Sequence, residues 1–252
     1  MFATSEVDGI TVIELAYGRA NAIDVEFCTG LVELLERLDV AGTGGVVLTA
    51  RGNIFSAGVD LLRLLEGGPA YALEFLPVLS GMARALFEFP RPLVAAVNGH
   101  AIAGGCVMAC AADVRLMAEG PGRIGVPELQ VGVPFPAIAL EIMRSAASPG
   151  VFATLIEEGT LLDAEAARAS GLVDTVVPAD ALVSSARERA ARLAAIPHEV
   201  FALTKRQVRA PALARVDAAH SMSADVVRIW TTPSTFDAVR SYVERTLRPR
   251  AG

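Results

Sequence analysis

The sequence is short of aromatic residues and of positive charge. Phe, Trp and Tyr make up 6% of its 252 residues, and 22 Lys and Arg stand against 28 Asp and Glu, for a net charge of −6. A surface that stacks nucleic-acid bases needs aromatic side chains, and one that binds phosphates or an anionic membrane needs a basic stripe. We therefore expect neither a nucleic-acid partner nor a membrane partner.

Cysteine and histidine are also scarce. The three cysteines, Cys28, Cys106 and Cys110, are an odd number, and the last two lie in an apolar run. A disulfide framework or a metal site needs paired or clustered ligands. The pattern therefore predicts buried thiols, no metal, and a reducing compartment, the cytoplasm.

A long unbroken apolar segment is missing as well. The most apolar stretch, residues 92–112, is interrupted by Asn98, His100 and three glycines, whereas a membrane span needs about 20 largely apolar residues. The N-terminal residues carry no basic segment followed by an apolar one, so we expect no signal peptide. Both absences fit a cytoplasmic protein.

Hydrophobic residues are plentiful, at 53% of the chain, which is enough for a large core. Apolar or β-branched runs predict strands at residues 9–15, 45–49, 93–97 and 113–117. Helical spacing predicts helices at 24–40 with Asp24 as N-cap, at 71–87, at 104–112 and, for one turn, from Pro127. Repeated strand–turn–helix units predict an α/β fold with helices outside the sheets.

The last third of the sequence has a mainly helical pattern. Helices are predicted at residues 137–146, 151–157, 164–169, 181–195, 199–208 and 213–247, the last with breaks near Pro233, and one strand at 173–177. No long Gly/Ser linker separates this part from the rest, so we expect one integrated unit.

Two glycine turns each lead from a strand into a helix. The first is Asn-Ile-Phe-Ser-Ala-Gly-Val-Asp-Leu at residues 53–61, and the second is Asn-Gly-His-Ala-Ile-Ala-Gly-Gly-Cys at 98–106. Each would present free backbone N–H groups at the start of a helix, where the helix dipole also favours negative charge. Two such ends facing each other would bind an oxyanion. Taken alone, either turn can instead be a tight turn that needs glycine for its backbone.

Taken together, these turns and their surroundings resemble the crotonase, or enoyl-CoA hydratase/isomerase, superfamily, in order along nearly the whole chain. The matching segments are Asn-Ala at 21–22, Phe-Ser-Ala-Gly-Val-Asp-Leu at 55–61, Ala-Ala-Val-Asn-Gly at 95–99, Ala-Gly-Gly-Cys at 103–106, Ala-Asp at 112–113, Pro-Glu-Leu-Gln-Val-Gly at 127–132 and Leu-Thr-Lys at 203–205. The resemblance implies a crotonase-like β-spiral core of repeated strand–strand–helix turns over residues 1–190. A helical region over 191–252 would build homotrimers, often paired into hexamers.

The resemblance further implies an acyl-CoA thioester as substrate, with coenzyme A as part of the substrate and no other cofactor. The family's oxyanion donors map onto the backbone N–H groups of Val59 and Gly104. Gly104 would let the thioester approach closely.

Other substrate contacts also follow from the resemblance. The loop with Arg19, Ala20 and Ala22 would lie along the pantetheine and ADP parts of CoA, and the first glycine turn would contribute Ser56, Ala57, Gly58, Asp60 and Leu61. Asp60 is also the expected cap of a helix that begins at Leu61. Lys205 is expected to contact a CoA phosphate, within its own subunit or across a subunit boundary. Residues 62–80 would supply apolar walls for the acyl chain, with Leu64, Leu65, Tyr71, Phe75 and Leu76.

The choice of reaction depends on the side chains that move protons. Hydratases of this family carry one glutamate three residues after the oxyanion glycine and another in the Pro-Glu motif; here these positions are Val107 and Glu128. Hydration needs water activated at C3 and a proton delivered at C2, which two carboxylates share more readily than one, whereas moving a double bond needs one base. A lone Glu128 therefore predicts an isomerase that converts 3-enoyl-CoA to trans-2-enoyl-CoA. The pattern is most similar to the mitochondrial-type enoyl-CoA isomerase branch.

The charge state of Glu128 is left open by the sequence. Pro127 at the first helical position would place Glu128 in the first turn, where the helix dipole lowers its pKa while apolar burial raises it. Two alternatives to the isomerase also stay open: a 2-enoyl-CoA hydratase in which Glu128 acts alone, and an acyl-CoA-binding homologue without turnover.

Overall fold

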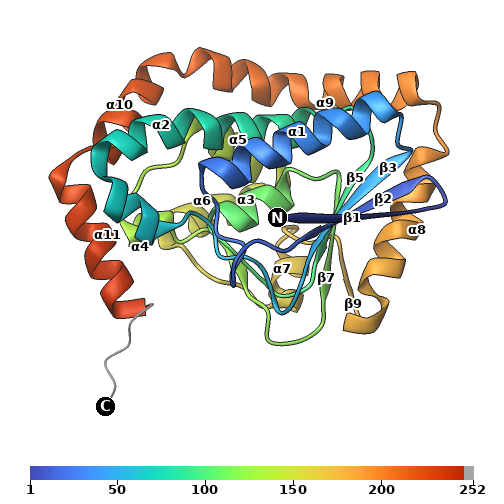
Figure 1. Ribbon diagram of the computed structural model, residues 1–252, viewed down its shortest axis with the longest axis horizontal. Coiled ribbons are helices and arrows are strands. Elements are labelled where there is room, and N and C mark those ends of the chain that lie inside the picture. The colour runs from blue at the N-terminus through green and yellow to red at the C-terminus, as the bar shows by residue number, and fades with distance from the viewer. Residues whose placement is uncertain (247–252) are drawn as a thin grey trace.

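The computed structural model describes residues 1–246 as a mixed α/β fold with two sheets (Figure 1). The larger sheet has the order β1 (Phe2–Val7), β2 (Ile10–Leu15), β3 (Gly45–Ala50), β5 (Leu93–Val97), β7 (Val114–Ala118) and β9 (Thr175–Val177). Its strands pair in parallel except for β1, which is antiparallel to β2. The smaller sheet is parallel, with the order β4 (Ile54–Ser56), β6 (His100–Ile102) and β8 (Ile124–Gly125).

The chain repeats one unit three times. Each repeat runs from a strand of the larger sheet through a strand of the smaller sheet into a helix: β3–β4–α2 (Leu61–Glu88), β5–β6–α3 (Gly104–Cys110) and β7–β8–α4 (Glu128–Val131). The predicted strand–strand–helix core is confirmed, as is the one-turn helix after Pro127. Because the short strands are parallel neighbours, the three helices start from the same edge of the smaller sheet.

Strands β3 and β5, at the centre of the larger sheet, are buried on both faces, and their alternate residues pack into different cores. On β3, Val46 and Leu48 face the main core, whereas Val47 faces a second cluster with Leu182 and Ala186 of α8 (Leu182–Ala194). A parallel sheet covered on both sides needs apolar residues at consecutive positions, which explains the unbroken apolar strand sequences.

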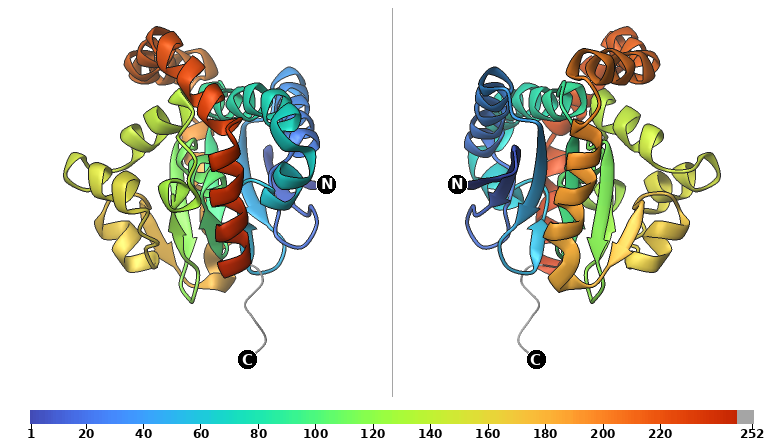
Figure 2. Two further views of the ribbon diagram at one scale, coloured as in Figure 1. Left: turned by 90° about the vertical axis from the view of Figure 1, so that its left-hand side faces the viewer. Right: turned by 90° about the vertical axis from the view of Figure 1, so that its right-hand side faces the viewer.

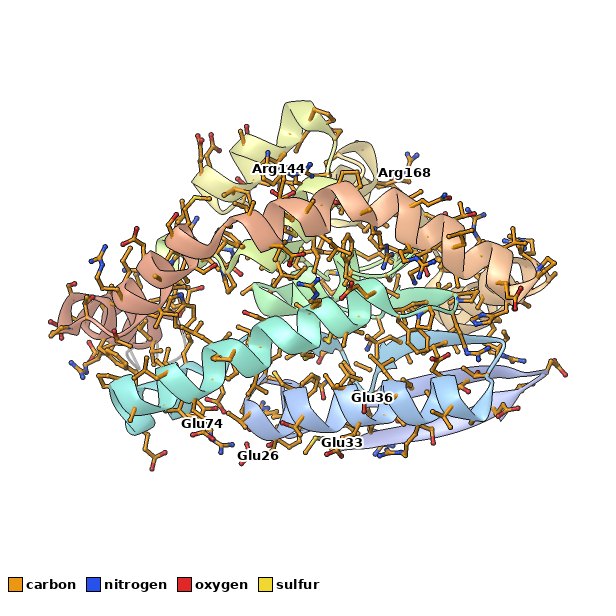
Figure 3. All side chains as sticks on the ribbon, turned by 90° about the horizontal axis from the view of Figure 1, so that it is seen from above. Glu26, Glu33, Glu36, Glu74, Arg144 and Arg168 are labelled. Carbon is orange, nitrogen blue, oxygen red and sulfur yellow. The ribbon has the colours of Figure 1, made fainter. Side chains whose placement is uncertain are left out.

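Helices α1 (Val25–Ala41), α2 and α3 cover the main core. Asp24 caps α1 as predicted, because its carboxylate accepts a hydrogen bond from the N–H of Phe27. Glu33 and Glu36, both labelled in Figure 3, lie on the exposed side of α1. The apolar stripe of the helix thus accounts for its orientation.

The remaining helices are α5 (Ala137–Ala146), α6 (Pro149–Glu158), α7 (Ala164–Ala169), α9 (His198–Ala218), α10 (His220–Trp230) and α11 (Pro233–Thr246). Figures 1 and 2 show α9 running beside α2, and α10 and α11 lying at the end of the molecule far from α8. Helix α11 contacts both α2 and α4. The C-terminal helices therefore reach the region where the repeated helices begin.

Several elements differ from the prediction. Strand β1 was not predicted, because it is an edge strand whose residues are mostly exposed and lack an apolar pattern. Helix α2 begins at Leu61, ten residues before the predicted start at 71, and it is kinked at Gly68. Helix α9 continues through Pro211 instead of ending at 208. The end of the expected C-terminal region, residues 247–252, lies outside the described residues.

Within residues 1–246, α2 is a helix whose length and composition would allow it to cross a membrane, and 39% of its most apolar window is buried. Its apolar side chains, including Phe75, Met82 and Leu86, belong to the main core. Packing in the core therefore accounts for its apolar character.

Candidate active site

A cavity with mainly apolar walls lies where α2, α3, α4, α5, α10 and α11 meet. Its empty volume is about 820 Å³, open solvent at the mouth included. Five of the predicted site residues lie on its wall: Ala57, Val59, Leu61, Gly104 and Glu128. The structure thus brings both glycine turns and the Pro-Glu motif together in one place.

The backbone N–H group of Val59 points away from Ile23, with which Val59 forms a parallel bridge. The N–H of Ile23 donates to the carbonyl of Gly58 (2.8 Å), and the N–H of Asp60 donates to the carbonyl of Ile23 (3.0 Å). In such a parallel bridge, the residue between the two bonded positions points its own N–H to the opposite side. Among the described residues, the N–H of Val59 has no acceptor.

Gly104 supplies a second free N–H group at the start of α3. As the first residue of the helix it has no intrahelical acceptor, and Ala103 before it makes no side-chain cap. A Cβ placed on Gly104 would lie 3.9 Å from the Val59 nitrogen, so the two backbone segments adjoin. Ala103 has a positive φ of 53°, an unfavourable conformation for alanine of the kind found at functional sites.

Gly58 allows the two turns to approach each other. Its φ is 83°, and a Cβ on it would lie 2.8 Å from both the Ala103 Cβ and the Ile102 carbonyl oxygen. No other residue fits this position without moving one of the two turns.

The loop predicted to follow CoA is fastened to the first glycine turn. The Asn21 side chain donates to the carbonyls of Ile54 and Phe55, and Ser56 donates its hydroxyl to the Asn21 carbonyl at 2.7 Å. The same hydroxyl accepts from the N–H of Gly58 at 3.1 Å. Ser56 is completely buried, so its place in the structure is between the two backbone segments, not on the cavity wall.

The other predicted contacts do not line the cavity. Arg19 is exposed, and Ala20 and Ala22 are half-buried. The Ala20 carbonyl accepts from the N–H of Ala57 at 3.0 Å, which places this loop beside the first turn. Asp60 caps α2 as predicted, because its carboxylate accepts from the N–H of Arg63.

Glu128 is buried at the start of α4. The residue is 9% exposed, and its Oε2 atom has no hydrogen-bond partner among the described residues. Burial raises its pKa from 4.5 to about 8, against a smaller lowering by its own backbone N–H. Of the two opposing effects that the sequence left open, burial is the larger, because α4 has only four residues and a short helix contributes little dipole.

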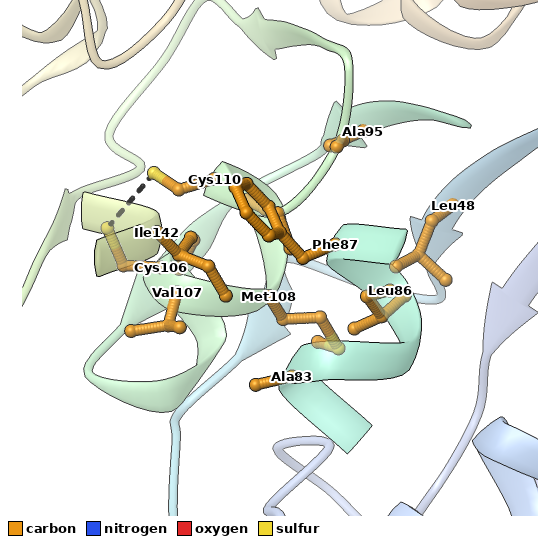
Figure 4. Packing of buried hydrophobic residues seen from close by; sticks show 14 of the residues in the cluster. Leu48, Ala83, Leu86, Phe87, Ala95, Cys106, Val107, Met108, Cys110 and Ile142 are labelled. Atoms are coloured by element: carbon orange, nitrogen blue, oxygen red, sulfur yellow. Dashed lines mark hydrogen bonds between the residues drawn. The ribbon is translucent and has the colours of Figure 1, made fainter. Parts of the chain in front are cut away.

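Val107 lies on the same wall, on α3, so this position provides an apolar side chain and no second carboxylate. Figure 4 shows α3 against the end of α2, with Met108 directed towards Leu86 and Ala83. Cys106 and Cys110 are buried free thiols, as predicted, with their Sγ atoms 4.0 Å apart. The interior side of α3 is therefore packed with apolar and thiol groups, and Glu128 is the only acid on the cavity wall within the described part of the chain.

Lys205 is buried, and its predicted contact with a CoA phosphate stays a prediction. Its ammonium group is buried and donates to Asp113 Oδ2 at 2.7 Å and to the Arg91 carbonyl at 3.2 Å. It does not line the cavity that contains Glu128. The ammonium group thus already has two intrachain acceptors, a burial that sequence patterns do not reveal because lysine is usually exposed.

Part of the wall was missed by sequence reasoning. Trp230 of α10 and Tyr242 of α11 line the cavity, although both lie more than 100 residues after Gly104. Leu79 and Ser80, at the end of the expected range 62–80, line the cavity together with Met82. Leu64 and Leu76 are instead buried in a cluster with Val239 and Val243 of α11. Helix α2 is kinked at Gly68, whose φ of 63° and ψ of −157° are not helical, and periodicity alone does not reveal this kink.

Comparison with known proteins gives a consistent result. The family model described as enoyl-CoA hydratase/isomerase matches residues 5–247. Human mitochondrial enoyl-CoA delta isomerase 1 is 31% identical over 211 residues, which is 82% of this chain and 70% of that protein. A putative enoyl-CoA hydratase from Thermus thermophilus is 32% identical over 191 residues, 74% of this chain and 75% of that protein.

The three-dimensional similarity extends over the whole chain. The crystal structure of human mitochondrial delta3-delta2-enoyl-CoA isomerase superposes with a TM-score of 0.93 at 28% identity, covering 100% of this chain and 99% of that one. The agreement includes the helical C-terminal region that closes the cavity.

Proposed function

This chain belongs to the enoyl-CoA hydratase/isomerase family, and we propose that within this family it is an isomerase that converts 3-enoyl-CoA to trans-2-enoyl-CoA. The observation that carries the proposal is the pairing of Glu128 with Val107 on one cavity wall. A single buried base suits the movement of a proton along an acyl chain, because removal and return can use the same group.

The thioester carbonyl is held by the backbone N–H groups of Val59 and Gly104 in this proposal. Neither group has an acceptor among residues 1–246, and the two belong to adjoining backbone segments. Two preorganised donors stabilise the negative charge that develops on the carbonyl oxygen when a proton leaves C2. Because the donors belong to the backbone, the valine side chain does not interfere with this role.

Glu128 is the proton carrier. Its carboxylate takes a proton from C2, and the electron pair moves through the C1–C2 bond to the thioester oxygen, which gives a dienolate. The carboxyl group then returns the proton to C4, the C2–C3 bond becomes double, and the carbonyl forms again. A pKa near 8 makes the carboxylate a stronger base than an exposed glutamate, which supports removal of a weakly acidic proton.

Acyl-CoA contacts follow the cavity. We assign the acyl chain to the apolar wall with Leu79, Met82 and Ile138, and the CoA portion to the loop with Arg19, Ala20 and Ala22 beside Ala57. Gly58, Ser56, Asp60 and Leu61 keep supporting roles in the first turn. Lys205 is omitted from this assignment because of its buried partners.

Assembly into homotrimers or hexamers and a cytoplasmic location remain part of the proposal. Val200, Leu203 and Val208 of α9 are exposed apolar residues, 47% to 74% accessible, which supports burial of this helix between subunits. Three buried, free cysteines fit a reducing compartment. Light scattering of the purified protein tests the assembly: a mass three or six times that of one chain is expected.

The activity test compares wild type with Glu128→Gln on 3-hexenoyl-CoA and crotonyl-CoA, followed by the absorbance of the conjugated thioester. We expect wild type to raise the absorbance of 3-hexenoyl-CoA, and Glu128→Gln to lose about 10²- to 10⁴-fold in rate. Glu33→Gln, which removes an exposed glutamate of α1, is the matched control and keeps full activity.

The two substrates separate the alternatives. Absence of reaction on 3-hexenoyl-CoA with loss of absorbance from crotonyl-CoA would replace the isomerase with a hydratase. If neither substrate reacts but both thioesters bind tightly, the protein binds acyl-CoA without turnover.

A further inference from the structure

Helix α11 packs against the end of α4. A Cβ on Gly132, the residue that ends α4, would lie 2.6 Å from the Cβ of Ala238. Glu128 stands four residues before Gly132, and Tyr242 stands four residues after Ala238. Both side chains line the cavity beside this contact, and the charge of Glu128 acts on Tyr242, so the two groups lie within electrostatic reach of each other.

Both side chains line the same cavity, and both have unused hydrogen-bonding capacity. Glu128 Oε2 is buried without a partner, and the Tyr242 hydroxyl forms no hydrogen bond with any described residue. Trp230, the other polar side chain contributed by the C-terminal helices, already donates its indole N–H to the Pro134 carbonyl at 2.9 Å. On the α11 side of the cavity, Tyr242 is therefore the free donor.

Few other charges act on this pair. The charge of Glu128 is felt by Cys106 on α3 and by Tyr242 on α11, and each responds with a raised pKa, for which burial is the largest cause. Arg245, on the same helix as Tyr242, acts in the opposite direction on the tyrosine. With its pKa raised, the phenol stays protonated and able to donate at every pH at which Glu128 titrates.

We propose that Tyr242 is a positioning residue for Glu128, whose hydroxyl donates a hydrogen bond to the Glu128 carboxylate when that group is ionised. The inference rests on the proposed role of Glu128 as the proton carrier. It assigns a role in the reaction to the C-terminal helix of the same chain.

The physical need for such a donor follows from burial. A carboxylate without a hydrogen bond is costly in an apolar cavity, and a donor to the charged form lowers that cost and the pKa. The two side chains are not hydrogen-bonded in the described conformation, so the bond requires a change of rotamer within the cavity they share. The donor also fixes the direction of the carboxylate, which matters for a base that must reach both C2 and C4.

The test is Tyr242→Phe, which keeps the ring and removes the hydroxyl. We expect the acid limb of the kcat/KM profile on 3-hexenoyl-CoA to move to higher pH by at least about half a unit, because the ionised base loses a donor. At pH 7 the rate should fall roughly three- to tenfold, since one pH unit corresponds to a tenfold change in the ionised fraction. KM should stay within about twofold.

Ser241→Ala is the matched control. It removes a hydroxyl from the neighbouring residue of α11, which is exposed and bonded to the Asp237 carbonyl, and it should leave the profile in place. In the double variant Glu128→Gln/Tyr242→Phe, the tyrosine substitution should add no further loss. An unmoved acid limb in Tyr242→Phe, a shift to lower pH, or an additive loss in the double variant would each overturn the proposal.

A measurement without substrate separates this inference from the proposed function. Carbon-13 NMR of protein labelled at the glutamate carboxyl groups gives the pKa of Glu128 directly, the signal being assigned by its absence in Glu128→Gln. A higher pKa in Tyr242→Phe than in wild type supports the link even if 3-hexenoyl-CoA is not a substrate. Equal pKa values would reject the link even in an active isomerase.

Discussion

Gly132 and Ala238 bring α4 and α11 together: a Cβ at 132 would stand 2.6 Å from the alanine Cβ. Gly132 also has a positive φ of 94°. We expect Gly132→Ala to lower the free energy of unfolding by about 2 to 4 kcal/mol, from backbone strain and overpacking together. Urea unfolding measures the loss, and enoyl-CoA turnover should fall with it because α11 is displaced from the cavity.

Gly42→Ala isolates the backbone part of this effect. Gly42 also ends a helix with a positive φ, of 78°, but a Cβ there would meet no atom within 4 Å. The control should lose about 1 to 2 kcal/mol and keep its activity. Equal losses in the two variants would show that the contact with Ala238 is not tight.

Gly58→Ala tests the spacing of the two backbone donors. The new Cβ would meet Ala103 and Ile102 at 2.8 Å and push the first glycine turn away from Gly104. Because a displacement of about 1 Å can cost 10²-fold in rate, we expect kcat to fall by about that factor. Gly52→Ala, with a similar φ of 80° but open space around it, should retain activity within about twofold; matching losses in both variants would contradict the spacing argument.

The pH dependence of the reaction should report the ionisation of Glu128. The base must be deprotonated, and its pKa is raised to about 8 by burial. The kcat/KM value, which follows the free enzyme, should therefore decrease as pH falls below about 8. An acid limb near pH 4.5, the ordinary value for glutamate, would mean that Glu128 is not buried in the working enzyme or is not the base.

The stability of the folded protein should decrease with rising pH, whereas the activity should increase. The folded protein favours protonated Glu128, so its contribution is fully favourable below about pH 4.5 and is lost as pH rises through about 8. At about 1.4 kcal/mol per pH unit, the upper limit of the loss is of order 5 kcal/mol. Glu128→Gln should thus be as stable as wild type near pH 4 and more stable at pH 9, which urea unfolding at the two pH values would reveal.

Most of the fold could be predicted where local sequence and burial agree. Asp24 precedes an amphipathic segment, and it caps α1 because capping depends only on the next three residues. Strand β1 could not be predicted, because an edge strand with exposed polar side chains owes its structure to pairing with β2. The predicted end of α9 at residue 208 was wrong, because tertiary packing keeps the helix continuous across Pro211, a residue type that usually ends a helix.

The candidate site was predictable as far as its residues lie in short motifs. Val59, Gly104 and Glu128 meet in one cavity because each follows a strand of the same small parallel sheet. Their chemical roles stay predictions. Tyr242 could not be found from the sequence, because only the docking of α11 on α4 brings it to the cavity.

Lys205 offers a sharp test of a sequence expectation, because its ammonium group is buried against intrachain acceptors. Asp113 accepts hydrogen bonds from Lys205 and Arg209, each at 2.7 Å, and from the N–H of Leu93 at 2.8 Å. Removing the carboxylate leaves two buried cations without their counter-ion. Asp113→Asn should therefore lose about 3 to 5 kcal/mol of stability in urea unfolding. Lys205→Met should lose less, because Asp113 retains Arg209.

Kinetics then separate a structural lysine from a phosphate-binding one. If Lys205 held a CoA phosphate, Lys205→Met would raise KM for 3-hexenoyl-CoA by about tenfold or more, the loss expected for a hydrogen bond to a charged group. The same variant would leave KM for 3-hexenoyl-pantetheine unchanged, because that substrate has no phosphate. We expect instead that KM for both substrates stays within about twofold of wild type, since the ammonium group already bonds to Asp113 and the Arg91 carbonyl.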